Sequence, residues 1–567
     1  MISSDKKVVQ LLLELCVSKG VRKVVFSPGS RNAPLAIAAD YHPEIETFVI
    51  HDERSAAFFA LGLSQQLNEP VAICCTSGSA PANYYPAVVE AYYQQIPLIV
   101  LSADRPEEWI DQGDGQTIRQ RGMFGQHARA FVQLSDKEMD ENNEWFVQRE
   151  LSAAFAEGLD SWKGPVHINV AFSEPLYNSI EIDRPKIKRL NLYKGKFELD
   201  SHLIDEWYKA MKCEKKMVII GQLPPSPRFN AALEELSKDP SIVFLVENTA
   251  NVKGQLFVHS IDRMLATIKP EEIDEFRPDV VISFGGAIVS KRIKTFLRES
   301  NLKSHWRIGV GFPYMDTFQQ LTHSVLANPE DFLHAVNQLS VDRVKSNFAG
   351  CWKKRDFLAQ EVGDAFAETC DFSDLKAIKL VLDFLPELSH LHMSNSSIVR
   401  YFQLFDPIHS VTFWSNRGTS GIDGSSSTAV GAAVANPNQL HVLVTGDVSF
   451  FYDSNALWNA YLPCNLRIIV VNNGGGGIFR IIDGASSSPQ TSTYFEAQHQ
   501  QSAEYLTKTF DIDYSSIHSE DEFENSMKVF YQIDETNRPK LIEVFTPRDQ
   551  NHLVLKEFFK VVSERFQ

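Results

Sequence analysis

Two polar residues in the C-terminal third of the chain are of the types that hold a magnesium ion. Asp447 and Asn473 each come directly after an apolar run, and they stand 26 positions apart. Mg²⁺ prefers octahedral oxygen ligands, usually one or two carboxylate or carbonyl groups completed by phosphate oxygens. Four glycines, residues 474–477, follow Asn473, and a glycine backbone can approach a phosphate closely. The pattern predicts a magnesium and diphosphate site at the carboxyl ends of two strands.

The competing interpretation is that both stretches are ordinary turns after strands. Gly, Asp and Asn are common in turns for conformational reasons alone, and a single such turn would favour this interpretation. Two of them, each after an apolar strand and the second continued by a glycine run, favour the functional interpretation.

A set of basic residues is the second chemical feature of the sequence. Each lies near a loop containing Gly or Ser: Arg31, Arg105, Lys291, Arg400 and Arg417. Any one arginine is more often a solvated residue or an ion-pair partner. Several at strand ends indicate a pocket for carboxylates, because a guanidinium group can bind a carboxylate through two hydrogen bonds. In α/β sheets, ligands collect at the carboxyl edge of the strands.

The elements that must position these residues are strands alternating with helices, which is typical of parallel α/β layers. Helices are expected at 8–17, 53–66, 80–94 and 426–435, with a polar linker at 177–193 and a helical connector at 335–375. The expected strands fall into three blocks: 21–26, 46–51, 71–75, 97–102 and 166–172; then 217–221, 242–246, 280–284 and 306–310; then 411–414, 443–445, 468–471 and 540–545. No sequence repeat is obvious. The pattern predicts an α/β protein of three Rossmann-like domains with mostly parallel sheets, divided at 1–185, 186–355 and 356–567.

Size, charge and cysteine content limit the class of protein. A chain of 567 residues is too long for one core. The 55 basic and 72 acidic residues give a net charge of −17, which argues against nucleic acid or an anionic membrane as partner. The seven cysteines form no CxxC pair and are expected to be reduced, as in a cytoplasmic protein. No apolar run approaches the roughly 20 residues of a membrane-spanning helix.

The Gly-Asp and Asn-Asn pairs at this spacing resemble the motif of thiamine-diphosphate enzymes. More specific stretches follow the same family: Ser27-Pro-Gly-Ser-Arg, Asp52-Glu-Arg, Thr76-Ser-Gly-Ser-Ala, Ala103-Asp-Arg-Pro, residues 416–424 and Gly477-Ile-Phe. Over essentially its whole length the chain resembles the family of 2-succinyl-5-enolpyruvyl-6-hydroxy-3-cyclohexene-1-carboxylate (SEPHCHC) synthases of menaquinone biosynthesis.

The resemblance implies a reaction, its cofactors and an assembly. Such an enzyme uses thiamine diphosphate with Mg²⁺ or Mn²⁺ to decarboxylate 2-oxoglutarate, and adds the succinyl-semialdehyde carbanion to isochorismate in a 1,4 fashion. It has pyrimidine-binding, central and diphosphate-binding domains, and is a cytoplasmic homodimer or dimer of dimers. Glu53 would come from one subunit, and Asp447 with Asn473 from the other.

The resemblance also implies residue roles. Asp447, Asn473 and the Gly475 carbonyl would hold the metal ion. As an isolated first-turn acid, Glu53 would merely complement a helix dipole; the resemblance places it in an apolar pocket against the cofactor pyrimidine, where it can share a proton. Further cofactor contacts would be Thr76, Gly78, Ile422, Gly446, Ile478 and Phe479. The residues implied for substrate binding are Ser30, Arg31, Arg105, Gln116, Lys291, Ser396, Arg400, Arg417, Ile478 and Phe479. Ser30, Arg31, Gln116, Arg400 and Arg417 are also expected to act in catalysis with Glu53.

Two alternatives stay open at this point. Another thiamine-diphosphate decarboxylase or carboligase needs only Glu53, Asp447 and Asn473, although small neutral partners would not require so many cations. A binding or scaffold protein on three Rossmann-like blocks is allowed by the fold alone, but it would have no need of Glu53.

Overall fold

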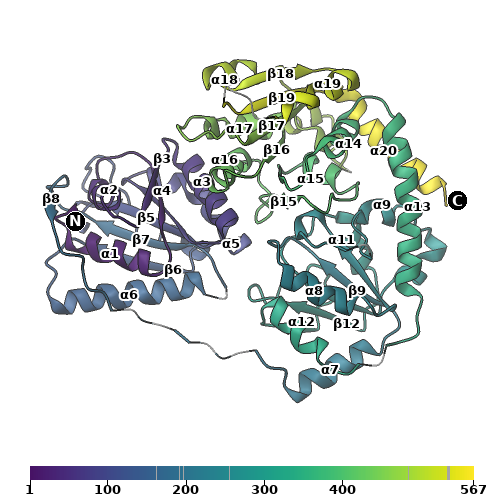
Figure 1. Ribbon diagram of the computed structural model, residues 1–567, viewed down its shortest axis with the longest axis horizontal. Coiled ribbons are helices and arrows are strands. Elements are labelled where there is room, and N and C mark those ends of the chain that lie inside the picture. Colours follow the sequence, from purple (N-terminus) through teal and green to yellow (C-terminus); the bar gives the residue numbers. More distant parts are fainter. Residues whose placement is uncertain are drawn as a thin grey trace.

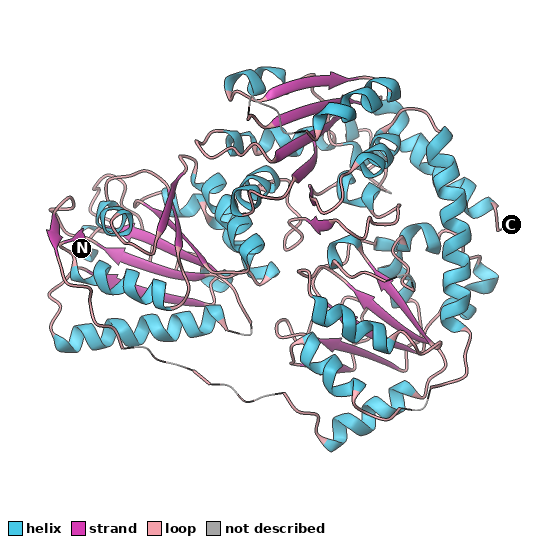
Figure 2. Ribbon diagram, in the orientation of Figure 1, coloured by secondary structure: helices cyan, strands magenta, loops and turns pink. Residues whose placement is uncertain are grey.

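Three parallel sheets with helices packed against them make up the protein (Figures 1 and 2). The computed structural model describes residues 1–160, 162–188, 190, 192–193, 195, 197–254, 256–341, 343–482, 484–532 and 537–566. In Figure 1 the first domain lies at the left, the central domain at the lower right and the third domain at the top. The predicted α/β fold with three domains is confirmed. Among the described residues, no helix combines the length and apolar character needed to cross a membrane.

The first domain contains a six-stranded parallel sheet in the order β3-β2-β4-β5-β7-β6. A separate antiparallel pair joins β1 (Ile2–Ser4) to β8 (Ser179–Glu181). Strand β8 lies within the stretch expected to be a linker. The strands of the large sheet are β2 (Lys23–Phe26), β3 (Glu46–Val49), β4 (Val71–Cys75), β5 (Leu98–Asp104), β6 (Ala130–Ser135) and β7 (Val166–Ala171). The helices are α1 (Lys7–Ser18), α2 (Ala33–Asp40), α3 (Glu53–Leu67), α4 (Ala80–Asn83), α5 (Tyr85–Gln94) and α6 (Glu141–Leu159).

The central domain contains a five-stranded parallel sheet in the order β10-β9-β11-β12-β13. Its strands are β9 (Lys216–Ile220), β10 (Ile242–Val246), β11 (Val280–Phe284), β12 (Ser304–Ile308) and β13 (His323–Val325). Its helices are α7 (Ser201–Met211), α8 (Pro227–Leu236), α9 (Ile261–Leu265), α10 (Ile273–Phe276), α11 (Lys291–Arg298) and α12 (Pro329–Asn337). The long helix α13 (Phe348–Thr369) runs from this domain to the third one and packs against the C-terminal helix (Figure 1).

The third domain has another six-stranded parallel sheet, in the order β15-β14-β16-β17-β19-β18. Its strands are β14 (His390–Met393), β15 (Thr412–Trp414), β16 (His441–Gly446), β17 (Leu466–Asn472), β18 (Asp513–Ile517) and β19 (Lys540–Phe545). Its helices are α14 (Asp374–Phe384), α15 (Ser397–Phe402), α16 (Ser425–Ala435), α17 (Asp447–Tyr452), α18 (Glu504–Thr509), α19 (Glu520–Phe530) and α20 (Arg548–Glu564).

The first and third domains repeat one topology. Numbering the six parallel strands of each domain by chain order gives the same spatial order, second-first-third-fourth-sixth-fifth, in both. Helix α3 follows the second strand of the first sheet, and α16 follows the second strand of the third sheet. Glu53 at the start of α3 thus occupies the place that the loop before α16 occupies in the third domain.

Helices α3 and α16 pack directly against each other and join the two domains. A Cβ atom added to Gly62 would lie 2.1 Å from the Thr428 carbonyl oxygen, and one added to Gly431 would lie 2.0 Å from the Phe59 carbonyl oxygen. Neither distance is compatible with a side chain, so each glycine permits the backbone of the other helix to approach. Phe58, Phe59, Ala429, Val430 and Ala433 belong to one apolar cluster that is continuous across this contact.

Several predicted elements differ from the observed ones. The helix expected at 80–94 divides into α4 and α5 at Tyr84, because Pro86 cannot donate the hydrogen bond that would continue α4. The strand expected at 306–310 corresponds to β12 and is not the last strand of the central sheet, because β13 pairs with it and forms the edge. The expected domain limit at 185 falls between β8 and α7, and the limit at 355 falls inside α13; both stay predictions.

Candidate active site

Asp447 lies at the carboxyl end of the third sheet, as the first residue of α17 after β16. Its side chain is buried, and Gly446 precedes it at the end of the strand. One carboxylate oxygen, Oδ2, accepts the backbone N–H of Gly474 at 2.7 Å and that of Gly475 at 3.0 Å. The side chain is therefore held across the gap between β16 and β17, next to the glycine run.

Asn473 supplies the second oxygen predicted for a metal ion. It follows β17 and is 8% exposed, and its Nδ2 donates to Asp374 Oδ2 at 2.9 Å. This hydrogen bond orients the amide so that Oδ1, which is buried, has no hydrogen-bond partner among the described residues. A buried, unpartnered oxygen of this kind is suited to bind a divalent cation. The residues present therefore fit Mg²⁺ or Mn²⁺.

The glycine run shapes the space beside these two side chains. Gly474 and Gly475 have positive φ angles of 75° and 151°. A Cβ atom on Gly475 would lie 2.8 Å from the Glu496 carbonyl oxygen. Only glycine fits here, which leaves backbone groups open to a diphosphate. No group of three or more His, Cys, Asp or Glu side chains that could hold a metal ion is found in the described part of the chain.

The loops that carry the expected substrate residues of the third domain are tied together by Asn395. Its Nδ2 donates to the carbonyl oxygens of Asn416 and Gly421, both at 2.7 Å, and its Oδ1 accepts Arg417 Nη1 at 2.9 Å. The next residue, Ser396, has a φ of 69° and accepts a hydrogen bond from Arg400 through its carbonyl oxygen. The structure thus brings Ser396, Arg400 and Arg417 together at one sheet edge.

Ile422, Ile478 and Phe479 border the same edge. The Ile422 carbonyl oxygen accepts Ser449 Oγ at 2.7 Å, which attaches its loop to α17. Ile478 is buried, and Phe479 is half-buried with its ring 5.8 Å from that of Phe495. Both belong to a short 3-10 helix, η6 (Gly477–Arg480), that begins within the glycine run.

Arg417 is buried and Arg400 is half-buried. Burial lowers the pKa of each guanidinium group. Arg417 is 6% exposed, and its Nε has no hydrogen-bond partner among the residues described. A buried and a half-buried guanidinium group at one loop cluster make a favourable place for an anion.

A carboxylate from the first domain holds the Arg417 loop. Glu90 on α5 is buried and accepts Gly418 N–H at 2.7 Å through Oε1, while Oε2 accepts the N–H and hydroxyl of Thr419, each at 2.6 Å. Since hydrogen bonds to a charged group are about twice as strong as neutral ones, this contact fixes the loop firmly. The position of Arg417 therefore depends on the first domain.

Glu53 is the first residue of α3 and is half-buried. Its Oε2 accepts Asn83 Nδ2 at 3.2 Å. The preceding residue, Asp52, accepts Asn455 Nδ2 at 2.7 Å, and the following one, Arg54, donates to the Tyr452 carbonyl oxygen at 2.8 Å. Glu53 therefore lies between two residues that contact the end of α17 and the turn after it. Asp447 is the first residue of the same helix.

The surroundings of Glu53 are in part apolar. Burial raises the pKa of both Cys75 and Tyr84, and the nearby charge of Glu53 adds to that effect. Glu53 therefore has two buried neighbours, Cys75 and Tyr84, and one polar neighbour, Asn83.

The expected residues of the first domain form a second cluster, at the carboxyl edge of its own sheet. Thr76 Oγ1 accepts Arg31 N–H at 3.2 Å, and the Gln116 backbone lies against Gly78, whose added Cβ would be 3.0 Å from the Gln116 Cα. Ser30 is exposed beside Arg31. The domain's own chain occupies both guanidinium groups here: Arg31 pairs with Glu174 at 3.1 Å, and Arg105 pairs with Asp114 at 3.0 Å.

The two clusters are not joined directly within this chain. Among the described residues, no hydrogen bond or ion pair links Ser30, Arg31, Arg105 or Gln116 to the third domain. Lys291, at the first turn of α11, is exposed. The structure therefore assembles the third-domain set and places the first-domain cations and Lys291 separately.

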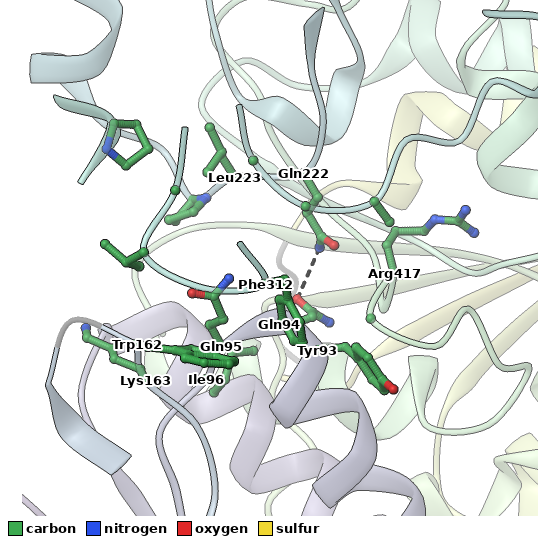
Figure 3. Close-up of a pocket in the computed structure, with 18 of the residues that line it drawn as sticks. Tyr93, Gln94, Gln95, Ile96, Trp162, Lys163, Gln222, Leu223, Phe312 and Arg417 are labelled. Carbon is green, nitrogen blue, oxygen red and sulfur yellow. Dashed lines mark hydrogen bonds between the residues drawn. The ribbon is translucent and has the colours of Figure 1, made fainter. Parts of the chain in front are cut away.

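A cavity of about 770 Å³ lies where the three domains meet. Figure 3 shows Arg417 at one end of it and Trp162 with Lys163 at the other. Gln222 of the central domain donates to Gln94 Oε1 of the first domain at 3.1 Å, drawn as a dashed line in Figure 3, and to the Ser415 carbonyl oxygen of the third at 2.7 Å. Gln222 thus connects all three domains. Its partner in the third domain, Ser415, lies two residues before Arg417.

Comparison with known proteins decides which family has this arrangement. Three family models match: the N-terminal TPP binding domain of thiamine pyrophosphate enzymes over residues 6–127, the middle domain of thiamine pyrophosphate over 190–389, and the C-terminal TPP binding domain of thiamine pyrophosphate enzymes over 394–544. The SEPHCHC synthase of Flavobacterium johnsoniae is 42% identical over 565 residues, covering 99% of this chain and 100% of that protein. The chain belongs to the SEPHCHC synthase family. The synthases of Porphyromonas gingivalis and Bacteroides thetaiotaomicron are 39% and 36% identical, each over 99% of this chain and 98% and 100% of their own.

Some residues that organise the site of this SEPHCHC synthase family member were not predicted from sequence. Glu90, Asn395 and Asp374 hold the Arg417 loop or Asn473, yet none stands in a glycine-rich motif. His499 lies 3.4 Å from Asp447 Oδ2, and that carboxylate raises the pKa of the imidazole. Asn395 follows β14 after one residue, Ser394, but this strand was not predicted, so no signal like that of Asn473 marked it in the sequence. The others are brought in by tertiary contacts.

Proposed function

We propose that this protein forms SEPHCHC by decarboxylating 2-oxoglutarate and joining the succinyl-semialdehyde unit to isochorismate, with thiamine diphosphate and Mg²⁺ or Mn²⁺. The observation that carries the proposal is the combination of the unpartnered Asn473 Oδ1 near the glycine run with a buried and a half-buried arginine, Arg417 and Arg400, at the same sheet edge, in a chain similar over its full length to named synthases. Both proposed substrates are carboxylates, which is the chemistry that Arg400 and Arg417 would bind.

Asp447, Asn473 Oδ1 and the Gly475 carbonyl would hold the metal ion. The backbone of the glycine run would face the diphosphate, with Gly446, Thr76 and Gly78 as further contacts, and Ile422 would support the ring system. When bound, thiamine diphosphate supplies the electron sink that a 2-oxo-acid decarboxylation requires. Glu53 would hold and move a proton at the pyrimidine ring, which is the general acid–base contribution of this chain.

The substrate side would divide between the two loop clusters. Ser396, Arg400, Ile478 and Phe479 would surround 2-oxoglutarate, because all four follow strands of the same sheet at its carboxyl edge. Ser30, Arg31, Arg105, Gln116, Lys291 and Arg417 would bind isochorismate or the carboxylates that both substrates share. Neutralising these carboxylates and excluding water are what the cations and apolar side chains contribute.

The assembly proposed is a cytoplasmic homodimer or dimer of dimers. It is supported by the separation of the first-domain cations from the third-domain cluster within one chain, since a second copy would offer a complementary set. In that arrangement Glu53 would come from one subunit, and Asp447 with Asn473 from the other.

Release of CO2 from competing 2-oxo acids tests the substrate assignment. We expect the wild-type protein with thiamine diphosphate, Mg²⁺ and isochorismate to release CO2 from 2-oxoglutarate at least tenfold faster than from pyruvate at equal concentration. The Arg400→Ala variant should lose most of this preference through a raised KM for 2-oxoglutarate. Equal use of pyruvate by the wild type would assign the site to another carboligase.

A further inference from the structure

Glu247 is a buried carboxylate at the carboxyl end of β10 in the central domain, and it is 1% exposed. Both of its oxygens accept the Val289 N–H at 2.8 Å, and Oε1 also accepts the Ser290 N–H at 2.8 Å. These are the last two residues before α11. Ser290 in turn caps that helix by accepting the Ile293 N–H at 3.1 Å. Glu247 therefore fixes the point at which α11 and Lys291 begin.

The charges around Glu247 come from several elements. The positive charge of Arg417, on the loop after β15, favours the ionised form of Glu247, and the negative charge of Asp262 on α9 disfavours it. The negative charge of Glu247 in turn favours the charged forms of Arg400 on α15 and Lys294 on α11. Lys294 has no hydrogen bond or ion pair among the described residues, and burial lowers the pKa of its ammonium group. One carboxylate thus faces a group of cations drawn from two domains.

The next residue extends the connection to the third domain. Asn248 Nδ2 donates to the Phe402 carbonyl oxygen at 2.9 Å, and Asn248 N–H donates to Gln403 Oε1 at 3.3 Å. Phe402 ends α15, the helix that carries Arg400. Two consecutive residues therefore hold the start of α11 on one side and the end of α15 on the other.

The hydrogen bonds to the Val289 and Ser290 N–H groups do not by themselves require a charged acceptor. A backbone N–H pair can be satisfied by a neutral Asn, Gln or Ser side chain, which would avoid the cost of burying a charge. The carboxyl group here is fully withdrawn from water, and this burial raises its pKa to about 7 despite the two backbone donors. Its hydrogen bonds to the two residues before α11, together with its electrostatic interaction with Arg417 and Arg400, point to a role in arranging the proposed substrate pocket.

We propose that Glu247 is a positioning residue that holds the Lys291 end of α11 in register with Arg400 and Arg417, so that cations of the central and third domains meet the carboxylates of one substrate. This inference rests on the proposed function, because it takes the substrates to be carboxylates. Glu247 itself touches no substrate. Its hydrogen bonds to the Val289 and Ser290 N–H groups set the geometry.

Two substitutions separate geometry from charge. In Glu247→Gln one carbonyl oxygen can accept both N–H groups, as Oε1 does now, so the position of α11 is kept and the charge is lost. In Glu247→Ala both contacts are lost. Glu272→Gln is the matched control in the same domain, since Glu272 is bound by Arg355 and the Lys269 N–H.

The test combines hydrogen exchange with steady-state kinetics on the holoenzyme. We expect Glu247→Ala to speed amide exchange in residues 289–290 at least tenfold and to raise the KM for 2-oxoglutarate at least tenfold, with kcat within threefold of wild type. Glu247→Gln should keep slow exchange and a KM no higher than threefold above wild type. Thermal unfolding and thiamine diphosphate titration verify that each variant is folded and binds cofactor.

Two results would overturn the inference. The first is an active Glu247→Ala variant with wild-type KM values, and the second is an equal rise of KM in the Gln and Ala variants while exchange differs. Failure of the proposed function is a separate outcome, because the wild-type protein would then not turn over 2-oxoglutarate with isochorismate at all. The exchange measurement still reports the contact between Glu247 and α11 in that case.

Discussion

Glu90 of the first domain accepts the backbone N–H of Gly418 in the third domain at 2.7 Å. The contact crosses a domain boundary, and its donor, Gly418, is the residue after Arg417. A helix of the first domain therefore sets the position of a guanidinium group in the third domain. Together with the Gly62 and Gly431 contact between α3 and α16, it makes the geometry of the proposed active site a property of two domains rather than one.

Replacing Glu90 should disturb that geometry. Glu90→Ala leaves the N–H groups of Gly418 and Thr419 without their acceptor, and losing buried hydrogen bonds to a charged group costs roughly 2–4 kcal/mol. We expect a lower thermal midpoint and a KM for isochorismate raised at least fivefold. Glu138→Ala, an exposed acid of the same domain, is the control and should behave as wild type. A Glu90→Ala variant with unchanged KM would show that the Arg417 loop holds its position without this contact.

Glu53→Gln should separate cofactor binding from turnover. The amide keeps the shape of the side chain, so the fold and most of the thiamine diphosphate affinity should persist. It cannot exchange a proton in the same way, and positioned acid–base groups contribute about 10²–10⁴-fold, so kcat should fall by at least two orders of magnitude. Fluorescence titration with the cofactor and a turnover assay measure the two properties. Glu46→Gln, on the preceding strand, is the control, and wild-type turnover in Glu53→Gln would remove Glu53 from the mechanism.

Asn473→Ala should weaken the metal-dependent binding of the cofactor. The substitution removes the unpartnered Oδ1 and also the hydrogen bond to Asp374. We expect the apparent Kd for thiamine diphosphate at fixed Mg²⁺ to rise at least tenfold, and the Mg²⁺ concentration needed for half-saturation to rise with it. Asn436→Ala, at the end of α16, is the matched control. An unchanged Mg²⁺ dependence would refute the assignment of Asn473 as a ligand.

Gly431→Ala tests the close approach of the two helices. The added Cβ would lie 2.0 Å from the Phe59 carbonyl oxygen, so α3 and α16 would have to separate. Overpacking of this kind costs about 1–3 kcal/mol. The thermal midpoint should fall, and activity should fall with it because Glu53 begins α3. Gly115→Ala introduces the same methyl group into open space and should be neutral. Equal stability of the two variants would contradict the tight crossing.

The grouping of Asp447, Asn473 and the glycine run could be predicted because its signals are local. Asp447 and Asn473 each follow an apolar strand, and the structure places both at one sheet edge beside the glycine run. Arg400 and Arg417 were predicted in the same way and lie together. Glu90 and Glu247 could not be, because a single acid on a helix or after a strand has many ordinary explanations, and only tertiary packing brings it to a distant loop.

The repeated topology was also hidden in the sequence. The first and third sheets have the same strand order, yet their strands share little beyond apolar character. The β14 strand was missed because two of its four residues are histidines, which read as polar although burial lowers the pKa of both His390 and His392. Burial that depends on a neighbouring strand is not visible in a short segment.

The most direct test of the proposed reaction is a spectroscopic assay of isochorismate consumption by the purified protein. Thiamine diphosphate, Mg²⁺ and 2-oxoglutarate are each left out in turn. We expect isochorismate to disappear only when all three are present, with CO2 released in equal amount. Consumption of 2-oxoglutarate without loss of isochorismate would contradict the proposed synthase activity and indicate a plain decarboxylase.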